Sequence, residues 1–457
     1  MMKFILDNIG IVRESEIELN GITVITGHNN SGKTTVSKAL YSIVSSVENL
    51  GKNNLRDKNN ATEVFVNNLI SEIWLRSSAH KEEGNLISKM TIPYNPELLE
   101  EEGAERYLEI FRENECRMLE NAAQEASQKD AQEFYVDLQH SFERKVEDFG
   151  KRLRFEYEPV NYVNKKLDSI LNAEFNEQIL PVNSDVDTGS IQLFADEKKI
   201  FDVVVKKQGL SRRKETFSMS LFDSGCIFID DVYVLDELIE KVEKEDKNTG
   251  LFWSKLIKDT APKIKIEKHK QKLINSLWQK EGRTYGSALD KEKAEKIYGK
   301  LAYVFNDKIV LESGKLVCAN SKIHVGNLAM GAKVFALLRM LLDNGTITKD
   351  TILILDEPEV HLHPEWQNVL AELLVLIMQE IHATILLTTH SSQFLMALET
   401  YTKQYKQHEW FKVYTTERLE NSHFVKYVDC TERIKDVYYK LAKPMFDIKI
   451  LKDNIEE

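Results

Sequence analysis

The chain has 457 residues, of which 42% are apolar and 29% are charged, and its formal net charge is −12. These proportions are typical of a soluble globular protein, and the length is sufficient for two or three compact units. The sequence has no apolar run of membrane-spanning length and no basic N-terminal region followed by an apolar block, so we expect a cytoplasmic protein. The acidic balance provides no general attraction to nucleic acid, and any contact with DNA would need a local basic patch.

The four cysteines are widely separated in the sequence, at Cys116, Cys226, Cys318 and Cys430. This spacing argues against a disulfide framework and against a zinc site built from cysteines. It fits a protein that stays in a reducing compartment.

Two short strands are predicted near the N-terminus, at residues 3–6 and 16–19. The second alternates polar and apolar residues, and Asn8 and Gly10 lie in the turn between the two strands. We expect a hairpin that leads into the apolar run at residues 22–26.

A phosphate-binding loop is predicted directly after this run, because Gly27, four variable residues and Gly32-Lys33-Thr34 follow a strand and precede a helix. The two glycines allow a tight turn that directs backbone N–H groups and the start of the helix at phosphate oxygens. Lys33 can reach the β- and γ-phosphates, and the Thr34 hydroxyl can bind Mg²⁺. The predicted nucleotide ligands of this loop are Gly27, Asn29, Asn30, Ser31, Gly32, Lys33, Thr34 and Thr35.

The next part of the chain is predicted to be largely helical. Apolar residues at helical spacing predict a helix over residues 35–47, whereas the polar residues 49–62 are predicted as a loop. Residues 95–153 are charged and helical, and their apolar stripe from Leu138 to Leu153 is typical of a helix packed against another helix. We therefore expect a solvated helical arm without a long coiled coil.

A small antiparallel β layer is predicted over residues 173–205, where β-forming runs are broken by turn residues. The densest basic cluster follows, and on a hairpin tip it would either contact a DNA backbone or simply be solvated. Its candidate DNA contacts are Lys206, Lys207, Arg212, Arg213 and Lys214. A second helical section over residues 234–300 carries another basic segment, residues 263–270, with the same two interpretations.

A buried strand that ends in two carboxylates is predicted at residues 351–357. A continuous apolar strand belongs in a parallel sheet covered on both faces, with functional groups at its carboxyl end. Asp356 is therefore placed to bind Mg²⁺, and Glu357 to orient or deprotonate an attacking water. Together with the upstream loop, the two acids predict a magnesium-nucleotide site.

The segment after these acids contains His361 and His363 and then Pro364, which suits the first turn of a helix. Local hydrogen bonding at the helix entry explains the two histidines better than a transition-metal site does. A second buried strand, residues 383–389, ends in His390, which we expect beside the other strand ends and within reach of a γ-phosphate. Beyond it the sequence predicts two more strands and a short helical tail, at residues 410–414, 424–428 and the end of the chain.

In combination, these motifs resemble the ABC-type ATPase heads of the SMC, RecF and overcoming-lysogenisation (OLD) proteins. The resemblance is carried by the loop at 27–34, the strand and acids at 352–357, the Glu-Pro-Glu-Val-His-Leu-His-Pro continuation and the Thr-His-Ser strand end. It covers residues 1–50 and 300–415 well. It implies an α/β P-loop NTPase fold of the ABC/SMC-head type, with an antiparallel β layer and a large inserted helical region.

By this resemblance we expect five segments along the chain. They are the N-terminal part of the head with the Walker A loop (1–94), a helical insertion (95–172), the Q-loop and β layer (173–233), a second helical segment (234–300), and the C-terminal part of the head with the signature, Walker B and switch histidine (301–457).

The resemblance also implies two heads that dimerise around two ATP molecules, each site being completed by a signature loop of the other subunit. The best match to that loop, residues 327–333, has Ala329 and Met330 where the family has a serine and its first glycine. Recognition of the partner's γ-phosphate would then depend on Gly331, Lys333 and the start of the following helix. The missing serine favours slow hydrolysis, or ATP acting chiefly as a dimer clamp.

Gln178 is the best match to the family's Q-loop glutamine, which contacts Mg²⁺ and the attacking water. The cofactors implied are ATP and Mg²⁺. The implied catalytic residues are Lys33, Glu357 and His390, and the implied metal ligands are Thr34, Gln178 and Asp356.

A lone head with no room for a nuclease module after His390 resembles the ATPase subunits of bacterial anti-phage systems such as Septu and PARIS. This implies an ATP-dependent sensor, a homodimer or higher homo-oligomer, that controls a separate nuclease or toxin effector. Three alternatives stay open: a RecF-like DNA-repair clamp, the nucleotide-binding subunit of a membrane transporter, and a non-catalytic ATP-dependent scaffold. The absent signature and the large insertions fit a transporter poorly.

Overall fold

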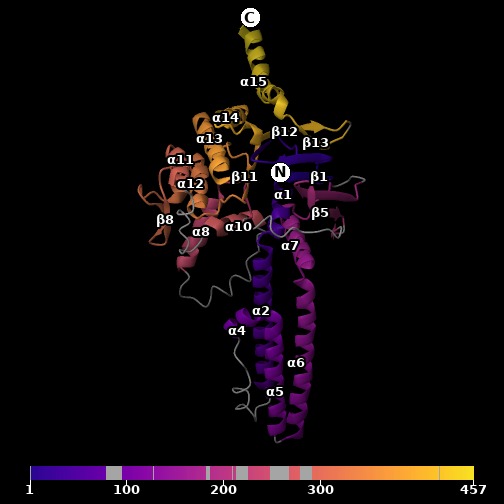
Figure 1. Cartoon of the computed structure of the whole chain (residues 1–457). Coiled ribbons are helices and arrows are strands. Elements are labelled where there is room, and N and C mark those ends of the chain that lie inside the picture. Colours follow the sequence, from indigo (N-terminus) through magenta and orange to yellow (C-terminus); the bar gives the residue numbers. More distant parts are fainter. Residues whose placement is uncertain are drawn as a thin grey trace. The chain divides into compact units, whose positions relative to one another are not determined.

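The computed structural model describes residues 2–78, 95–126, 128–181, 186–207, 209–212, 225–247, 267–277, 291–420 and 422–456. The chain divides into two compact units, one formed by Met1–Glu48 with Lys166–Glu457 and the other by Asn49–Lys165 (Figure 1). Helix α7 (Pro159–Glu174) runs across the boundary between them in the sequence.

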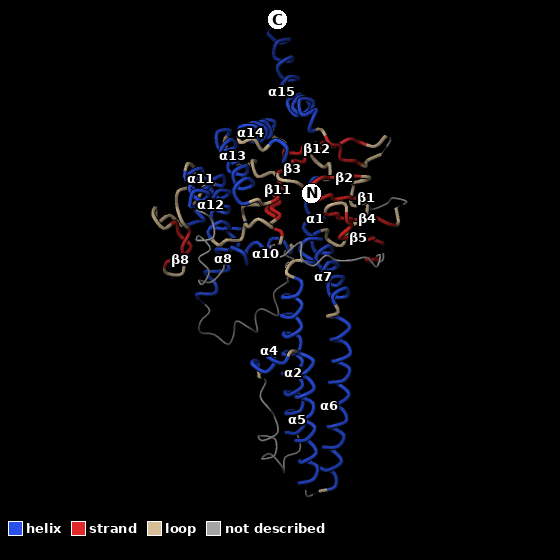
Figure 2. The backbone as a smooth tube through the Cα atoms, in the orientation of Figure 1, coloured by secondary structure: helices blue, strands red, loops and turns tan. Residues whose placement is uncertain are grey.

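The larger unit contains a six-stranded sheet with the strand order β13-β12-β3-β11-β10-β7 (Figure 2). Its strands are β3 (Ile22–Thr26), β7 (Cys226–Ile229), β10 (Ile352–Asp356), β11 (Thr384–Thr389), β12 (Phe411–Arg418) and β13 (Val425–Asp429). The pairs from β12 to β7 are parallel, and β13 is antiparallel to β12. Parallel strands place their carboxyl ends at one edge, so the ends of β3, β10 and β11 meet there as predicted.

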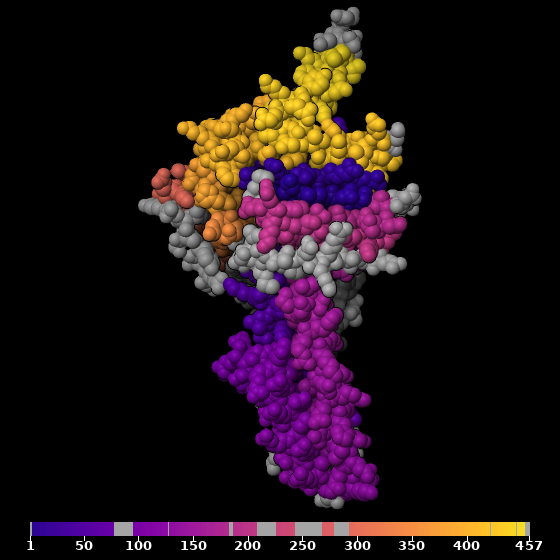
Figure 3. Space-filling model, turned by 45° about the vertical axis from the view of Figure 1, so that its right-hand side comes forward, coloured from indigo at the N-terminus to yellow at the C-terminus, as the bar shows by residue number. Residues whose placement is uncertain are grey.

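A second, five-stranded sheet of the same unit is antiparallel, with the order β2-β1-β4-β5-β6. Its strands are β1 (Met2–Asp7), β2 (Ser15–Leu19), β4 (Thr188–Ala195), β5 (Lys198–Lys206) and β6 (Gly209–Arg212). This confirms the predicted N-terminal hairpin and the predicted antiparallel layer. In Figure 3 the surface of β1 and β2 lies between the C-terminal strands and the β4–β5 hairpin.

Helices and a small hairpin complete the larger unit. The helices are α1 (Lys33–Val47), α8 (Val234–Lys247), α10 (Lys268–Leu277), α11 (Lys291–Ala302), α12 (Met330–Asp343), α13 (Pro364–Ile381), α14 (Ser392–Gln404) and α15 (Ile434–Glu456). The short elements are β8 (Ile309–Glu312), β9 (Lys315–Cys318) and the 3-10 turns η2 (Val325–Asn327), η3 (His408–Trp410) and η4 (Thr431–Arg433). At 23 residues, α15 is longer than the short tail predicted.

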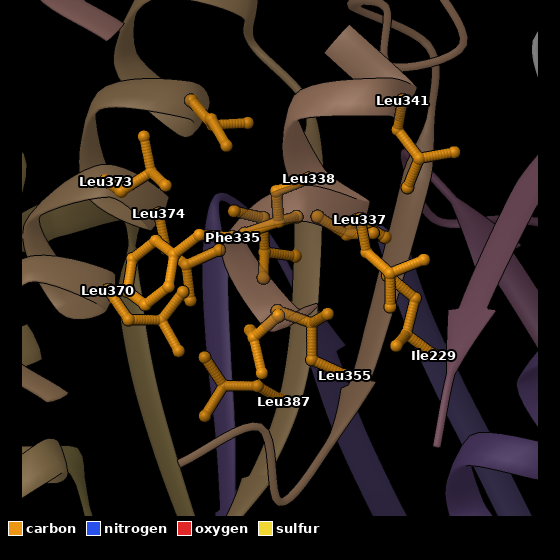
Figure 4. Close-up of a cluster of buried hydrophobic side chains, with 14 of the residues drawn as sticks. Ile229, Phe335, Leu337, Leu338, Leu341, Leu355, Leu370, Leu373, Leu374 and Leu387 are labelled. Atoms are coloured by element: carbon orange, nitrogen blue, oxygen red, sulfur yellow. The ribbon is translucent and has the colours of Figure 1, made fainter. Parts of the chain in front are cut away.

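The core of this unit joins the parallel sheet to two helices. Figure 4 shows Leu355 of β10 and Leu387 of β11 against side chains of α12 and α13, including Phe335, Leu338 and Leu370. All five side chains are buried. Such burial of apolar area is the main favourable term in folding, and here it fixes the strands whose ends carry the site.

The smaller unit is a bundle of helices. They are α2 (Leu50–Ser78), α4 (Pro96–Glu102), α5 (Ala104–Glu125) and α6 (Lys129–Glu156). The predicted apolar stripe of α6 is buried, with the Phe142 ring 5.6 Å from that of Phe111 on α5. Phe149 stacks on Phe65 of α2 at 3.9 Å. The predicted packing of this helix against other helices is therefore confirmed.

The prediction of a loop over residues 49–62 is wrong, because these residues form the first half of α2. The second half has a buried apolar stripe that includes Val66 and Leu69, and extending an existing helix costs far less than starting one. The polar residues find tertiary partners: Asn54 Nδ2 donates to the Tyr157 carbonyl at 2.9 Å, and Asp57 accepts from the Tyr162 hydroxyl at 2.7 Å. These bonds could not be read from local composition.

Candidate functional site

The phosphate-binding loop connects β3 to α1, as predicted. Gly32 precedes α1 with a φ of +78°, and a Cβ at this position would lie 2.8 Å from Cγ2 of Val12, so glycine is required. Among the described residues no side chain caps the start of α1, which leaves its first N–H groups directed outward. Ser31 is buried, and its Oγ has no hydrogen-bond partner within the described part of the chain. A loop with open donors and an unused hydroxyl fits a bound phosphate.

The carboxyl end of β10 places Asp356 beside the start of α1. Thr34 Oγ1 donates to Asp356 Oδ2 at 2.6 Å, and Thr388 Oγ1, on the neighbouring strand β11, donates to Oδ1 at 2.5 Å. Burial raises the pKa of Asp356, and the two hydroxyl donors oppose that rise. A hydroxyl and a carboxylate oxygen in contact are the hard oxygen donors that Mg²⁺ prefers, so this pair fits the predicted ion.

Three predicted catalytic side chains converge next to this pair. Lys33 Nζ lies 2.5 Å from Nε2 of His390 and 3.5 Å from Oε1 of Glu357, and that Nε2 lies 2.8 Å from the same Oε1. Burial lowers the pKa of Lys33, against the attraction of Glu357. Burial and then the charge of Lys33 lower the pKa of His390, so its imidazole is favoured in the neutral form.

Glu357 has a backbone conformation that non-glycine residues seldom adopt, with a φ of +48°. Its N–H donates to the carbonyl of Thr388 at 3.2 Å and to the hydroxyl of Thr388 at 3.0 Å. These bonds to β11 hold the strained turn. The side chain is thereby directed to His390 rather than along the strand.

A cavity of about 370 Å³ opens at this edge of the sheet, and Thr34, Asp356 and Glu357 line it. Asp230, which our sequence reading missed, lines it too because it follows β7, the strand paired with β10. The available signal was an apolar run, Cys226–Ile229, followed by two aspartates. A second cavity of about 910 Å³ is lined by residues 28–31 of the phosphate-binding loop and by Thr416 and Arg418.

Asp230 belongs to a buried charged cluster with His269. Nδ1 of His269 lies 2.6 Å from Glu174 and Nε2 lies 3.0 Å from Asp230. Burial alone would lower the pKa of His269, but hydrogen bonds and charges of Asp230 and Glu174 raise it to about 9. Lys38 and Lys270 neutralise the remaining carboxylate, Glu267, at 2.6 and 3.3 Å. With ammonium groups already at these oxygens, the cluster is better suited to ion pairing than to binding a metal.

Not every predicted site residue lies at this edge. Gln178 is exposed in the loop after α7, and no contact joins its side chain to Asp356 or Thr34 among the described residues. The neighbouring Ile179 carbonyl accepts from Gly10 N–H at 2.9 Å, which brings the loop to the N-terminal turn. Its metal role stays a prediction.

Lys333 has a partner within its own chain. Its side chain is buried and its Nζ donates to both carboxylate oxygens of Asp236 at 2.8 Å, and its role at a partner's phosphate stays a prediction. Helix α12 begins at Met330, which places Gly331 and Lys333 in its first turn. A Cβ on Gly331 would lie 2.9 Å from the His361 carbonyl, so glycine permits close packing there. Its predicted role at a partner's phosphate is untested.

The basic cluster is described only in part. Lys206 and Lys207 are exposed, and Lys207 pairs with Asp187 at 2.9 Å. Arg213, Lys214 and residues 263–266 lie outside the described residues, as does the side chain of Arg212. By contrast, His363 acts as predicted, since its ring accepts from Glu365 N–H and caps α13.

A parallel sheet with this loop and these acids at its carboxyl edge defines an α/β P-loop nucleotide-binding protein. The family model described as "AAA ATPase domain" matches residues 1–395. The chain therefore belongs to that family, and the predicted α/β P-loop ATPase fold is confirmed.

Solved structures with a similar chain trace include heads of SMC proteins. An SMC head bound to the C-winged helix domain of ScpA is 12% identical with a TM-score of 0.41, over 93% of this chain and 96% of that one. The SMC head domain from Thermotoga maritima is 10% identical with a TM-score of 0.36, over 93% and 97%. The Pyrococcus furiosus head with an extended coiled coil, bound to the C-terminal domain of ScpA, is 10% identical with a TM-score of 0.39, over 96% and 99%.

No curated protein gives a significant match to this chain. Among the helices of the described residues, none combines the length and apolar character needed to cross a bilayer.

Proposed function

We propose that the chain binds Mg²⁺-ATP at the loop between β3 and α1 and hydrolyses it. One observation carries this proposal. Side chains from three separate parts of the sequence make contacts of 3.5 Å or less at one edge of the sheet, and they belong to Lys33, Thr34, Asp356, Glu357 and His390. Membership of an ATPase family supports the same conclusion. The resemblance to SMC, RecF and OLD heads predicts ATP as the nucleotide.

Each residue has a role that its position supports. Lys33 binds the terminal phosphates, and Thr34 with Asp356 would hold Mg²⁺, which neutralises phosphate charge when bound. Glu357 lies beside the space for a γ-phosphate and acts as the base that orients and deprotonates a water molecule. Neutral His390 contacts the γ-phosphate and steadies the Glu357 carboxylate at 2.8 Å.

The test compares two substitutions with the wild type. Glu357→Gln should keep ATP binding, lower kcat by about 100-fold or more, and trap an ATP-bound dimer. Lys33→Ala should lose ATP binding. Nucleotide titration and mass measurement in solution with ATP and Mg²⁺ give the readouts. A Glu357→Gln protein that stays monomeric with unchanged turnover would refute the assignment.

The signature segment favours a second candidate, a slow or non-catalytic ATP clamp. Ala329 offers no hydroxyl to a partner's γ-phosphate, and Lys333 would have to leave Asp236 to reach one. If ATP acts only as a clamp, the wild-type protein should dimerise with ATP, and its rate of ATP hydrolysis should be as low as that of the Glu357→Gln variant. Clear turnover in the wild type excludes the clamp.

We further propose that the ATPase is the regulatory subunit of an anti-phage system, acting as a dimer or higher homo-oligomer on a separate nuclease or toxin. The support is the resemblance of its motifs to the Septu and PARIS ATPases. The test is purification of the native operon products followed by mass measurement. A co-purifying nuclease or toxin whose activity depends on nucleotide state supports the proposal, whereas recombination partners and ATP-dependent DNA binding favour the RecF-like alternative.

A further inference from the structure

A buried carboxyl group, that of Glu359, lies beside the site and takes no direct part in the proposed hydrolysis. Glu359 is in the loop between β10 and α13, and its side chain is only 4% exposed. Its Oε1 accepts hydrogen bonds from the Thr389 hydroxyl and, at 3.2 Å, from the His390 backbone N–H. Its Oε2 has no hydrogen-bond partner within the described part of the protein. Burying such a group is costly, so its retention needs a reason.

The contacts of Glu359 determine the course of the chain at the end of β11. The Thr389 hydroxyl, which donates to Glu359, also accepts from Ser391 N–H at 3.0 Å. Ser391 in turn caps α14 by accepting from Phe394 N–H at 3.0 Å. One carboxyl group therefore anchors the residue before His390, the backbone of His390 and, through Thr389, the residue after it.

That anchoring sets where the imidazole of His390 can lie. With the backbone fixed, Nε2 reaches both Lys33 and Glu357, at 2.5 and 2.8 Å. A displacement of about 1 Å in a group that contacts a reacting phosphate is enough to lower a rate strongly. Burial also raises the pKa of Glu359, and the hydrogen bonds from Thr389 and from the His390 backbone oppose that rise.

We propose that Glu359 is a positioning residue, which sets the orientation of His390 by accepting hydrogen bonds from Thr389 and from the His390 backbone. This inference rests on the proposed ATP hydrolysis. It assigns to the second glutamate of Glu-Pro-Glu a function separate from that of Glu357. The neutral amide of glutamine can accept the same two bonds, and alanine cannot.

The experiment is a double-mutant cycle measured by steady-state ATP hydrolysis. Glu359→Ala should lower kcat by about 10- to 100-fold with KM for ATP changed less than about threefold, because the phosphate-binding loop is untouched. Glu359→Gln should stay within about threefold of the wild type. In a His390→Ala background, Glu359→Ala should cause no further loss, because its effect passes through His390.

A matched control separates positioning from general destabilisation. Glu372 is also nearly buried, on α13, where it accepts from the Tyr405 hydroxyl at 2.7 Å and pairs with Lys300 at 2.6 Å. Glu372→Ala should lower the denaturation midpoint and leave kcat unchanged. Additive losses from Glu359→Ala and His390→Ala, wild-type kcat in Glu359→Ala, or equal loss in Glu359→Gln and Glu359→Ala would each overturn the proposal.

A second readout does not depend on hydrolysis. In protein labelled at histidine, the ring signals of His390, assigned by their loss in His390→Ala, should shift in Glu359→Ala and stay in place in Glu359→Gln and Glu372→Ala. Unmoved His390 signals in Glu359→Ala would refute the positioning role. A wild-type protein without turnover would refute the proposed hydrolysis instead, and the ring signals would still decide the role of Glu359.

Discussion

At the scale of single residues, hydroxyl groups connect the acids of the site. Thr388 is the clearest case, since it donates to Asp356 and accepts from the N–H of Glu357. It is fully buried at the end of β11. Its role comes from the parallel register, which pairs Asp356 with Thr388 across the strands. From the sequence, Thr388 was predicted only as part of the buried strand at residues 383–389.

We predict that Thr388→Val, which keeps the shape and removes the hydroxyl, lowers kcat by about tenfold or more. Asp356 and the turn at Glu357 would each lose a hydrogen bond, at about 1 kcal/mol of stability apiece. Steady-state kinetics and denaturation measure the two effects. Thr402→Val is the matched control, because the hydroxyl of buried Thr402 donates to the Glu399 carbonyl of its own helix, away from the acids of the site. An equal kinetic loss in both variants would contradict this role.

At the scale of elements, the buried cluster around His269 joins four of them. His269 lies on α10, Glu174 ends α7, Asp230 follows β7 and Lys38 lies on α1. Lys38 Nζ also donates to the Glu174 carbonyl at 2.9 Å, so α1 is tied to the end of α7. The cluster therefore connects the elements that surround the phosphate-binding loop.

We predict that the cluster makes stability fall at alkaline pH. The folded-state pKa of His269 is raised from 6.5 to about 9, so its stabilisation is complete below its ordinary pKa and is lost as pH rises through about 9. The free energy of unfolding, measured with denaturant, should therefore be lower at pH 10 than at pH 7. His269→Asn should be destabilised by about 3 to 5 kcal/mol at pH 7, because the buried carboxylate of Glu174 loses its charged partner, and should show a weaker pH dependence.

The exposed His382 provides the control, because it ends α13 away from this cluster. His382→Asn should keep the pH dependence of the wild type. If His269→Asn kept that dependence as well, other groups would be responsible and the assignment to His269 would fail.

At the scale of the whole molecule, the net charge and the local basic cluster would have opposite effects on binding to DNA. The formal charge of −12 opposes binding to DNA, while Lys206 and Lys207 are exposed at the end of β5. Lys207 is paired with Asp187, but both side chains remain largely exposed, so the pair is weak and screened by salt. The predicted DNA contact can therefore be tested without disturbing the core.

We predict that changing Lys206, Lys207, Arg212 and Arg213 to Glu weakens DNA binding and flattens its dependence on salt. The slope of log affinity against log salt should decrease by about 0.9 for each DNA phosphate that the variant no longer neutralises. Fluorescence anisotropy with duplex DNA at several salt concentrations measures both. Lys198→Glu is the control, at the other end of β5. Unchanged affinity and slope would assign the cluster to solvated surface.

The predictions from sequence succeeded where the chemistry is local and periodic. Residue spacing was enough to predict the Gly-rich loop, the buried strands and the acids at their ends. Each of these features depends on only a few neighbouring residues. Most strands and helices of the larger unit were found in this way. The loop predicted over residues 49–62 failed because α2 is held by partners about 100 residues away, such as Tyr157 and Tyr162.

Tertiary structure alone decided how distant groups share their contacts. Lys333 was predicted as a phosphate ligand, and only the fold shows it bound to Asp236, about 100 residues earlier. Thr388 and Glu359 enter the site through strand register and burial, which no local pattern encodes. The physical reason is that a hydrogen bond or an ion pair depends on separation in space. Residue spacing determines that separation only within a single turn, strand or helix.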